Sequence, residues 1–173
     1  MRGFLTYVGL FLVAVVVMQL FVFDSVRVSI WFNPLVYIAF VALLPMNMKP
    51  VALLLLGFVT GAFMDMFEGT AGLHTAATLF VAYARRWMIV VTLGRETLQE
   101  PAMPSIKSLG GGRFLRYIVF VVVPHGLVYF SLEALTWTNY GLVLLKSAVS
   151  ALFSLLAVWA AALLFTVRTQ KKV

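Results

Sequence analysis

Long apolar runs, separated by short segments with polar residues, glycine or proline, dominate the pattern along this chain of 173 residues. A helix that crosses a membrane needs about 20 mostly apolar residues. Six runs of this kind predict transmembrane helices over residues 4–23, 33–47, 50–67, 71–92, 114–135 and 140–167. The second is short, because Asn33-Pro34 is typical of a helix start and Pro45 of a helix end. A short helix can still span when its neighbours screen it from lipid.

Composition supports a membrane protein. The chain is 63% hydrophobic and only 11% charged, whereas a soluble domain carries about 25% charged residues. Lipid is the solvent that such a chain requires, so we expect an all-α, polytopic membrane helix bundle that forms one domain over residues 1–173. Cysteine is absent, which excludes disulfides and thiolate chemistry.

The net charge of +7 would suggest a nucleic-acid partner in a soluble protein. Here the basic residues fall in the predicted loops and tails, where they set membrane orientation, so we expect no nucleic-acid partner. With the N-terminus inside, the inner segments hold Arg2, Lys49, Arg85, Arg86, Arg95, Lys107, Arg113, Arg116, Arg168, Lys171 and Lys172, and the outer segments hold Arg27 and Lys146. This bias predicts that both termini are cytoplasmic and that the long connection from Arg85 to Arg116 is irregular and cytoplasmic.

The stretch from Gly57 to His74 is the most informative part of the chain. Gly57, Gly61 and Asp65 are spaced by four and share one helix face. The two glycines permit close approach of another helix, which places Asp65 on a packed face near the outer end of its helix. A carboxylate there is costly unless it is paired or hydrated. Two interpretations stay open, a structural carboxylate bonded to neighbouring backbone and a site for a partner or ligand.

Other polar residues extend this candidate site. Gly69 and Gly72 predict a tight outer turn, after which His74 begins the next helix close to Asp65. His125, Tyr129 and Glu133 follow one another at intervals of four on the fifth predicted helix and are candidates for a polar interior. For His125 we favour a satisfied hydrogen bond between helices over a ligand role.

The last predicted helix carries a seam of small residues. Its members are Ser147, Ser150, Ser154, Ala157 and Ala161. Their alternating spacing of three and four is typical of a packed helix face. The seam faces either the bundle of this chain or the single transmembrane helix of a partner.

Several chemistries are missing from the sequence. It contains no H-E-x-x-H and no G-x-S-x-G motif, and Gly110-Gly111-Gly112 lacks the Lys-Ser/Thr of a phosphate-binding loop. Two distant histidines without cysteine form a poor set of metal ligands. We therefore expect no metal, no cofactor and no enzymatic activity.

A set of short motifs follows in order along the chain: Asn33-Pro34-x-x-Tyr37, Leu44-Pro45, Gly57, Gly61, Asp65, Gly69, Gly72, His74, Ala82-Tyr83-Ala84-Arg85, Gly112-Arg113-Phe114-Leu115-Arg116-Tyr117, His125 and Glu133. The order and spacing of these motifs resemble those of the bacterial rod-shape-determining membrane protein family MreD, and of its Bacteroidetes-type members in particular. These motifs cover most of the chain. Many members of this type have two histidines in the middle of the fifth helix, where this chain has Pro124-His125.

The resemblance implies a multi-pass protein of the bacterial inner membrane that helps to maintain cell shape and lateral peptidoglycan synthesis. The expected partner is MreC, which has one membrane helix and a periplasmic domain. The wider elongation complex would include MreB, RodA and a class B penicillin-binding protein, with membrane lipids around it. The family is similar in fold to the substrate-binding subunits of energy-coupling-factor transporters.

Three hypotheses follow. The first is a non-enzymatic scaffold that holds a partner helix. The second is a small-molecule-binding transport subunit, which predicts an outward-facing cavity lined by Asp65, His74 and Glu133. The third is a membrane enzyme with a close acid–base pair in such a cavity.

Overall fold

The computed structural model describes residues 33–135 and 139–168, and within this part all the regular secondary structure is helical. Two of the predicted features, the span 4–23 and the cytoplasmic termini, lie outside these residues. The helices are α2 (Ile38–Ala42), α3 (Pro50–Glu68), α4 (Leu73–Leu93), the 3-10 helix η2 (Arg95–Gln99), α5 (Ile106–Leu109), α6 (Gly111–Ala134) and α7 (Tyr140–Arg168).

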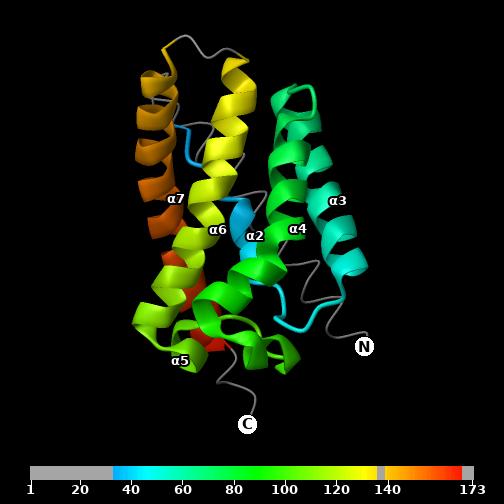
Figure 1. The fold of residues 1–173 in the computed structure, drawn as a ribbon, viewed down its shortest axis with the longest axis vertical. Helices are drawn as coiled ribbons and strands as arrows, with labels where there is room; N and C mark the ends of the chain where they lie inside the picture. The colour runs from blue at the N-terminus through cyan, green and yellow to red at the C-terminus, as the bar shows by residue number, and fades with distance from the viewer. Residues whose placement is uncertain (1–32, 136–138, 169–173) are drawn as a thin grey trace.

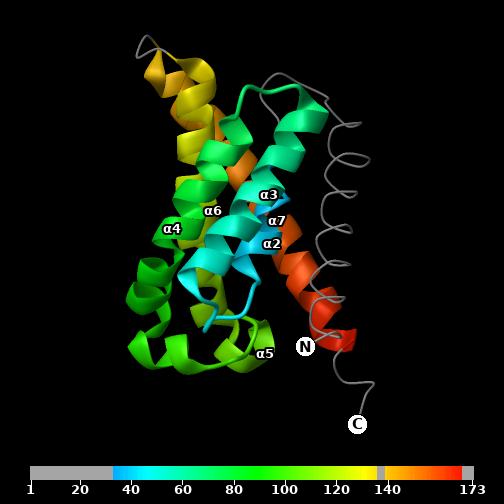
Figure 2. The same cartoon turned by 90° about the vertical axis from the view of Figure 1, so that its right-hand side faces the viewer.

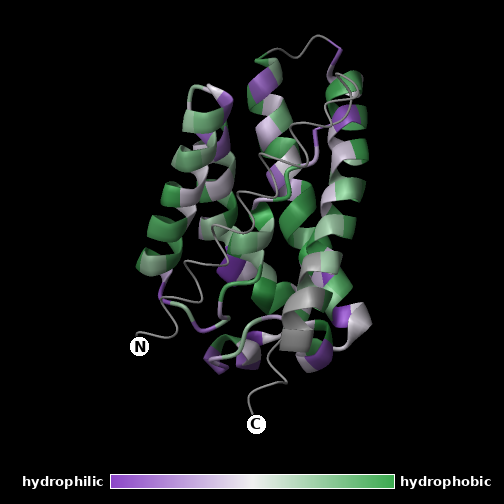
Figure 3. Ribbon diagram, turned by 180° about the vertical axis from the view of Figure 1, so that it is seen from behind, coloured by the Kyte–Doolittle hydropathy of each residue, from purple (hydrophilic) through white to green (hydrophobic). Residues whose placement is uncertain are grey.

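Four of these helices, α3, α4, α6 and α7, are long and apolar enough to cross a membrane. α3 has 19 residues, so at 1.5 Å per residue it is about 28 Å long, close to the hydrocarbon thickness of a bilayer. The predicted spans 50–67, 71–92, 114–135 and 140–167 match these helices closely. In Figure 3 hydrophobic residues, in green, predominate along the helices, and many of the hydrophilic residues, in purple, lie toward the ends of the bundle.

The long helices pack in a row. α4 lies against both α3 and α6, and α6 lies against α7. α2 occupies the centre, where it contacts α3, α4 and α6 (Figures 1 and 2). All five residues of α2 are buried. The core of the described bundle therefore forms around α2, a helix of only five residues.

α2 is much shorter than the predicted span 33–47. The helix ends at Ala42, and the N–H of Leu43 makes its last hydrogen bond, to the carbonyl of Ala39 at 3.0 Å. The chain then passes through Leu44 to Pro45 outside the helix. Proline disfavours a helical conformation in the residue before it, which explains why the helix cannot continue through Leu44. The freed backbone groups find side-chain partners on other helices, as described below.

α3 and α4 form a hairpin with a close contact between their backbones. A Cβ atom on Gly61 would lie 2.5 Å from the Cα of Thr75 and 2.9 Å from the carbonyl oxygen of His74. A Cβ on Gly57 would meet the Cβ of Ala82 at 3.0 Å. The prediction that these glycines permit close helix approach is confirmed by these distances.

The connection from Arg85 to Arg116 is more regular than the sequence predicted. α4 continues to Leu93 and α6 begins at Gly111, so only residues 94–110 connect them, and η2 and α5 lie within that segment. Arg85 belongs to α4 and is buried, so it does not count among the basic residues of the inner loops. The remaining basic residues of the predicted inner segments still outnumber Arg27 and Lys146 by a wide margin, so the positive-inside bias keeps its direction.

The small-residue seam of α7 faces the bundle of this chain. Ser147, Ser150 and Ser154 are buried. The Ser154 hydroxyl accepts a hydrogen bond from the backbone N–H of Leu35 at 2.9 Å, and that of Ser150 accepts one from Asn33 at 3.4 Å. Ala157 is half-buried on the same helix. The side chain of Ala161 lies outside the described part. Of the two predicted roles for this seam, intramolecular packing fits Ser147, Ser150 and Ser154.

Candidate functional site

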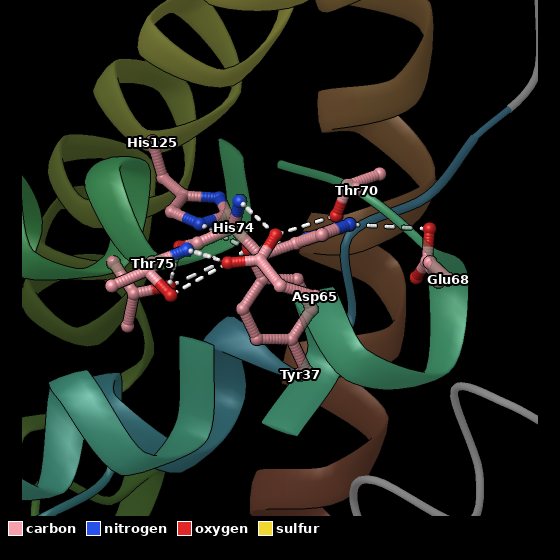
Figure 4. A network of polar contacts seen from close by, with 8 residues as sticks. Tyr37, Asp65, Glu68, Thr70, His74, Thr75 and His125 are labelled. Carbon is pink, nitrogen blue, oxygen red and sulfur yellow. Dashed lines mark hydrogen bonds and ion pairs between the residues drawn. The ribbon is translucent and has the colours of Figure 1, made fainter. Parts of the chain in front are cut away.

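Asp65 connects the end of α3 to the start of α4 (Figure 4). One carboxylate oxygen accepts hydrogen bonds from the Thr70 hydroxyl at 2.5 Å and the His74 backbone N–H at 3.0 Å. The other accepts from the Thr75 backbone N–H at 2.9 Å and the Thr75 hydroxyl at 2.6 Å. Four donors from the turn and the next helix thus converge on one side chain.

The local sequence explains why α4 needs this carboxylate. The first backbone N–H groups of a helix lack intrahelical partners, and an N-cap side chain usually accepts from them. The N-cap residue of α4 is Gly72, which has no side chain and adopts φ 86°. Asp65 supplies the missing oxygens from another helix, and its negative charge lies at the positive end of the α4 dipole. Its burial therefore has a structural explanation.

A row of four polar side chains crosses the bundle beside this cap. Glu68 Oε2 lies 3.1 Å from His74 Nε2. His74 Nδ1 lies 3.0 Å from the Tyr37 hydroxyl, and the same hydroxyl lies 2.9 Å from His125 Nε2. These side chains come from α3, α4, the residue before α2 and α6, so the row connects all four elements (Figure 4).

The Tyr37 hydroxyl is the centre of this row. It bonds both histidines and also receives a weak hydrogen bond from the Thr78 hydroxyl at 3.5 Å. Both imidazole rings lie edge-on to the Tyr37 ring, with centroids at 5.2 and 5.3 Å. Tyr37 and both histidines have no exposed surface. His125 Nδ1 is buried and has no hydrogen-bond partner within the described residues.

Arg85 forms a second polar cluster nearer the end of the bundle that carries α5. Its guanidinium donates to the carbonyl oxygens of Ala42, Leu44 and Pro45, and its Nε donates to the Tyr117 hydroxyl at 2.9 Å. Tyr117 in turn donates to the Ala42 carbonyl at 2.7 Å. These bonds satisfy the carbonyl groups that the early end of α2 leaves without helical partners. A buried cation is thereby paired with backbone dipoles.

The predicted site residues divide between these clusters and other places. Asp65 and His74 meet as expected, and Gly69 and Gly72 both adopt positive φ angles in the turn between them. His125 and Tyr129 are buried on α6, and the Tyr129 ring lies 4.6 Å from that of His74. Glu133 is separate, because its carboxylate pairs with Lys146 of α7 at 2.6 Å near the surface. The carboxylates of Asp65 and Glu133 are thus bonded in different places, Asp65 at the start of α4 and Glu133 between α6 and α7.

Several members of the clusters had no assigned role in the sequence analysis. No pattern in the sequence singled out Glu68, Thr70 or Thr75, and Tyr37 and Tyr117 were indicated only through the family resemblance. Arg85 was expected among the basic residues of the inner loops and not in the interior. A threonine on each side of Gly72, close after an intramembrane acid, is a usable signal, since hydroxyl groups are natural donors to a carboxylate. No local spacing connects Tyr37 with His125, because the contact spans 88 residues.

The acid and base groups of the arrangement bond one another and nearby backbone groups. Asp65 is committed to four donors of its own chain, and the carboxylate–imidazole pair of Glu68 and His74 is buried. Within residues 33–135 and 139–168 no group of three or more His, Cys, Asp or Glu side chains is placed to hold a metal ion. The chemistry of the site is that of interhelical hydrogen bonding.

No family model, no curated protein and no solved structure matches this chain.

Proposed function

We propose that this chain is a non-enzymatic scaffold of the MreD type in the bacterial inner membrane, with MreC as its direct partner. One observation supports this most. The residues that carry the family resemblance come from separate segments of the sequence, and they meet in two interior clusters. Tyr37, Asp65, His74 and His125 form one of them, and Arg85 with Tyr117 forms the other. Because the motif residues that this chain has in common with the MreD family build its interior, they favour the same helix bundle in both.

The interior clusters favour a scaffold over a ligand-binding or catalytic role. Asp65 and Glu133, two acids that a transport subunit would offer to a solute, are bonded to Thr75 and to Lys146 of this chain. The outward faces of α3 and α7, in contrast, carry exposed large apolar side chains. Surfaces of this kind contact lipid or another transmembrane helix, and they bind a partner by packing. A single-helix protein such as MreC fits this mode of binding.

Both ends of the chain are cytoplasmic in this proposal, and the turn between α3 and α4 faces the periplasm. The wider assembly would comprise MreB on the cytoplasmic side, RodA and a class B penicillin-binding protein. The role of the chain is then to hold MreC in place during lateral peptidoglycan synthesis.

The test is co-purification from native membranes. The tagged full chain is extracted in mild detergent, and the proteins that accompany it are identified by mass spectrometry. A multi-pass protein of similar size and abundance, with the same tag, is the control. We expect specific enrichment of a protein with one membrane helix and a periplasmic domain. Specific recovery of a nucleotide-hydrolysing transport module without such a protein would contradict the scaffold and favour the transport subunit.

A further inference from the structure

A groove of about 680 Å³ opens between α3 and α4 at the end of the bundle that carries η2. Its wall is mainly apolar, with Leu53 and Leu54 from the first turns of α3 and Ile89 and Val90 from α4. Met46, from the segment before α3, adds to the same wall. The apolar lining continues along two helices that are long enough to span a membrane, so a hydrocarbon chain fits it better than a water-soluble ligand.

The rim of the groove is cationic. Arg86 and Arg95 line it and are exposed, and Arg85 lines it from within. The Arg85 guanidinium is used by the carbonyls of α2, whereas Arg86 and Arg95 form no ion pair with any described residue. The described residues that line the groove include no aspartate or glutamate. The charge of the groove is therefore complementary to an anion at its mouth.

Two aromatic side chains mark the depth of the groove. Tyr83 and Trp87 also line it, are 80% and 62% exposed, and lie one turn apart on the outer face of α4. Tyrosine and tryptophan with this exposure are typical of the level of the lipid headgroups. The positive-inside bias assigns this end to the cytoplasmic leaflet, which contains the anionic lipids of many membranes.

We propose that this groove binds an anionic phospholipid of the cytoplasmic leaflet. The phosphate lies between Arg86 and Arg95, where the planar guanidinium groups donate bidentate hydrogen bonds to its oxygens. One acyl chain follows the apolar wall between α3 and α4, and the aromatic rings of Tyr83 and Trp87 flank the glycerol region. The site is separate from the Asp65 and Tyr37 clusters and does not depend on a protein partner.

Lipid binding to the purified full chain tests the site. The protein in mild detergent is titrated with dioleoyl phosphatidylglycerol and, separately, with dioleoyl phosphatidylcholine, and bound lipid is counted by native mass spectrometry. We expect tight binding of one phosphatidylglycerol molecule. The double variant Arg86→Gln/Arg95→Gln should weaken it about thirtyfold, because each basic residue near an anionic headgroup contributes a factor of about five. The control, Lys107→Gln/Arg116→Gln, removes two exposed cations that do not line the groove and should leave the affinity unchanged.

Two further measurements distinguish a phospholipid headgroup from a soluble phosphate as the bound anion. Inorganic phosphate and glycerol 3-phosphate carry the anion without acyl chains, and neither should displace phosphatidylglycerol at millimolar concentration. Displacement by either would overturn the lipid site in favour of a soluble phosphate. Equal binding of phosphatidylcholine, or equal loss in the two double variants, would also overturn it. The thermal unfolding midpoint of each variant shows that it is folded, and the two single arginine variants should each lose part of the affinity.

Discussion

The carboxylate of Asp65 accepts a hydrogen bond from the backbone N–H of His74 at 3.0 Å and so caps a helix to which it does not belong. Both of its oxygens face donors, because Thr75 bonds the second oxygen through its N–H and its hydroxyl. The burial of the Asp65 carboxylate is therefore explained by its hydrogen bonds within the α3–α4 hairpin.

This relationship predicts a stability cost for Asp65→Asn. The amide has only one acceptor oxygen, so its NH₂ group must face one of the two backbone donors and leave it unpaired. We expect a loss of about 1–3 kcal/mol in the free energy of unfolding, and a larger loss for Asp65→Leu, which leaves both donors unpaired. Chemical denaturation in detergent measures it, with Glu100→Gln, an exposed acid, as the control. Full stability with loss of partner binding would instead favour a functional charge.

The glycines of the α3–α4 contact predict a graded series of alanine variants. Gly61→Ala should be the most destabilising, because its new Cβ would lie 2.5 Å from the Thr75 Cα, which is backbone. Gly57→Ala meets only a side-chain carbon at 3.0 Å and should cost less. Gly112→Ala meets nothing within 4 Å and should gain up to about 1 kcal/mol of helix propensity. Membrane abundance and thermal unfolding give the order, and a reversed order would show that the two backbones are not in contact.

Arg85 predicts a large effect of removing a buried cation. Arg85→Gln removes the guanidinium hydrogen bonds to the carbonyls of Ala42, Leu44 and Pro45. The Ala42 carbonyl keeps the Tyr117 hydroxyl, whereas the Leu44 carbonyl loses its charged donor in an apolar interior. We expect a loss of at least about 3 kcal/mol, since hydrogen bonds to charged groups are worth about 1.5–3 kcal/mol each. Arg116→Gln, at an exposed position of α6, is the matched control. Similar unfolding curves for the two variants would disprove the role of Arg85.

The distribution of basic residues predicts the topology. Reporter fusions at Lys107 and after residue 173 should both read cytoplasmic, and a fusion within residues 136–139 should read periplasmic. The fusions are scored with a pair of reporters that are active on opposite sides of the membrane. Opposite compartments for the two chain ends would exclude six spans.

Sequence reasoning succeeded where local signals decide the structure. Pro50 at the first position of α3 and Gly69 after its last residue are start and stop signals that need no tertiary information. The spacing of Gly57 and Gly61 also predicted correctly which face of α3 approaches another helix, because residues four apart lie on the same face of a helix. The same reasoning placed Asp65 beside His74, since a tight turn leaves little freedom between them.

The remaining features depend on contacts that are distant in the sequence. The segment 33–47 has the composition of a short span, yet its helix covers only Ile38–Ala42, and the carbonyl of Ala42 accepts a hydrogen bond from Arg85, 43 residues away. Tyr37 looks like an ordinary apolar-face residue until α4 and α6 bring a histidine to each side of its hydroxyl. Glu133 shared a helix face with His125, but Lys146 draws its carboxylate outward to the next helix.

The brevity of α2 also affects the order of biogenesis. Five residues of helix extend about 8 Å, a small fraction of the hydrocarbon thickness, so this segment cannot settle in a bilayer as an independent span. The Ala42 carbonyl is bonded to Arg85, and Tyr37, which directly precedes α2, is bonded to His125. Both partners leave the ribosome after α2. The segment that lies at the centre of the finished bundle is therefore synthesised before its supports and must be among the last to assume its native position.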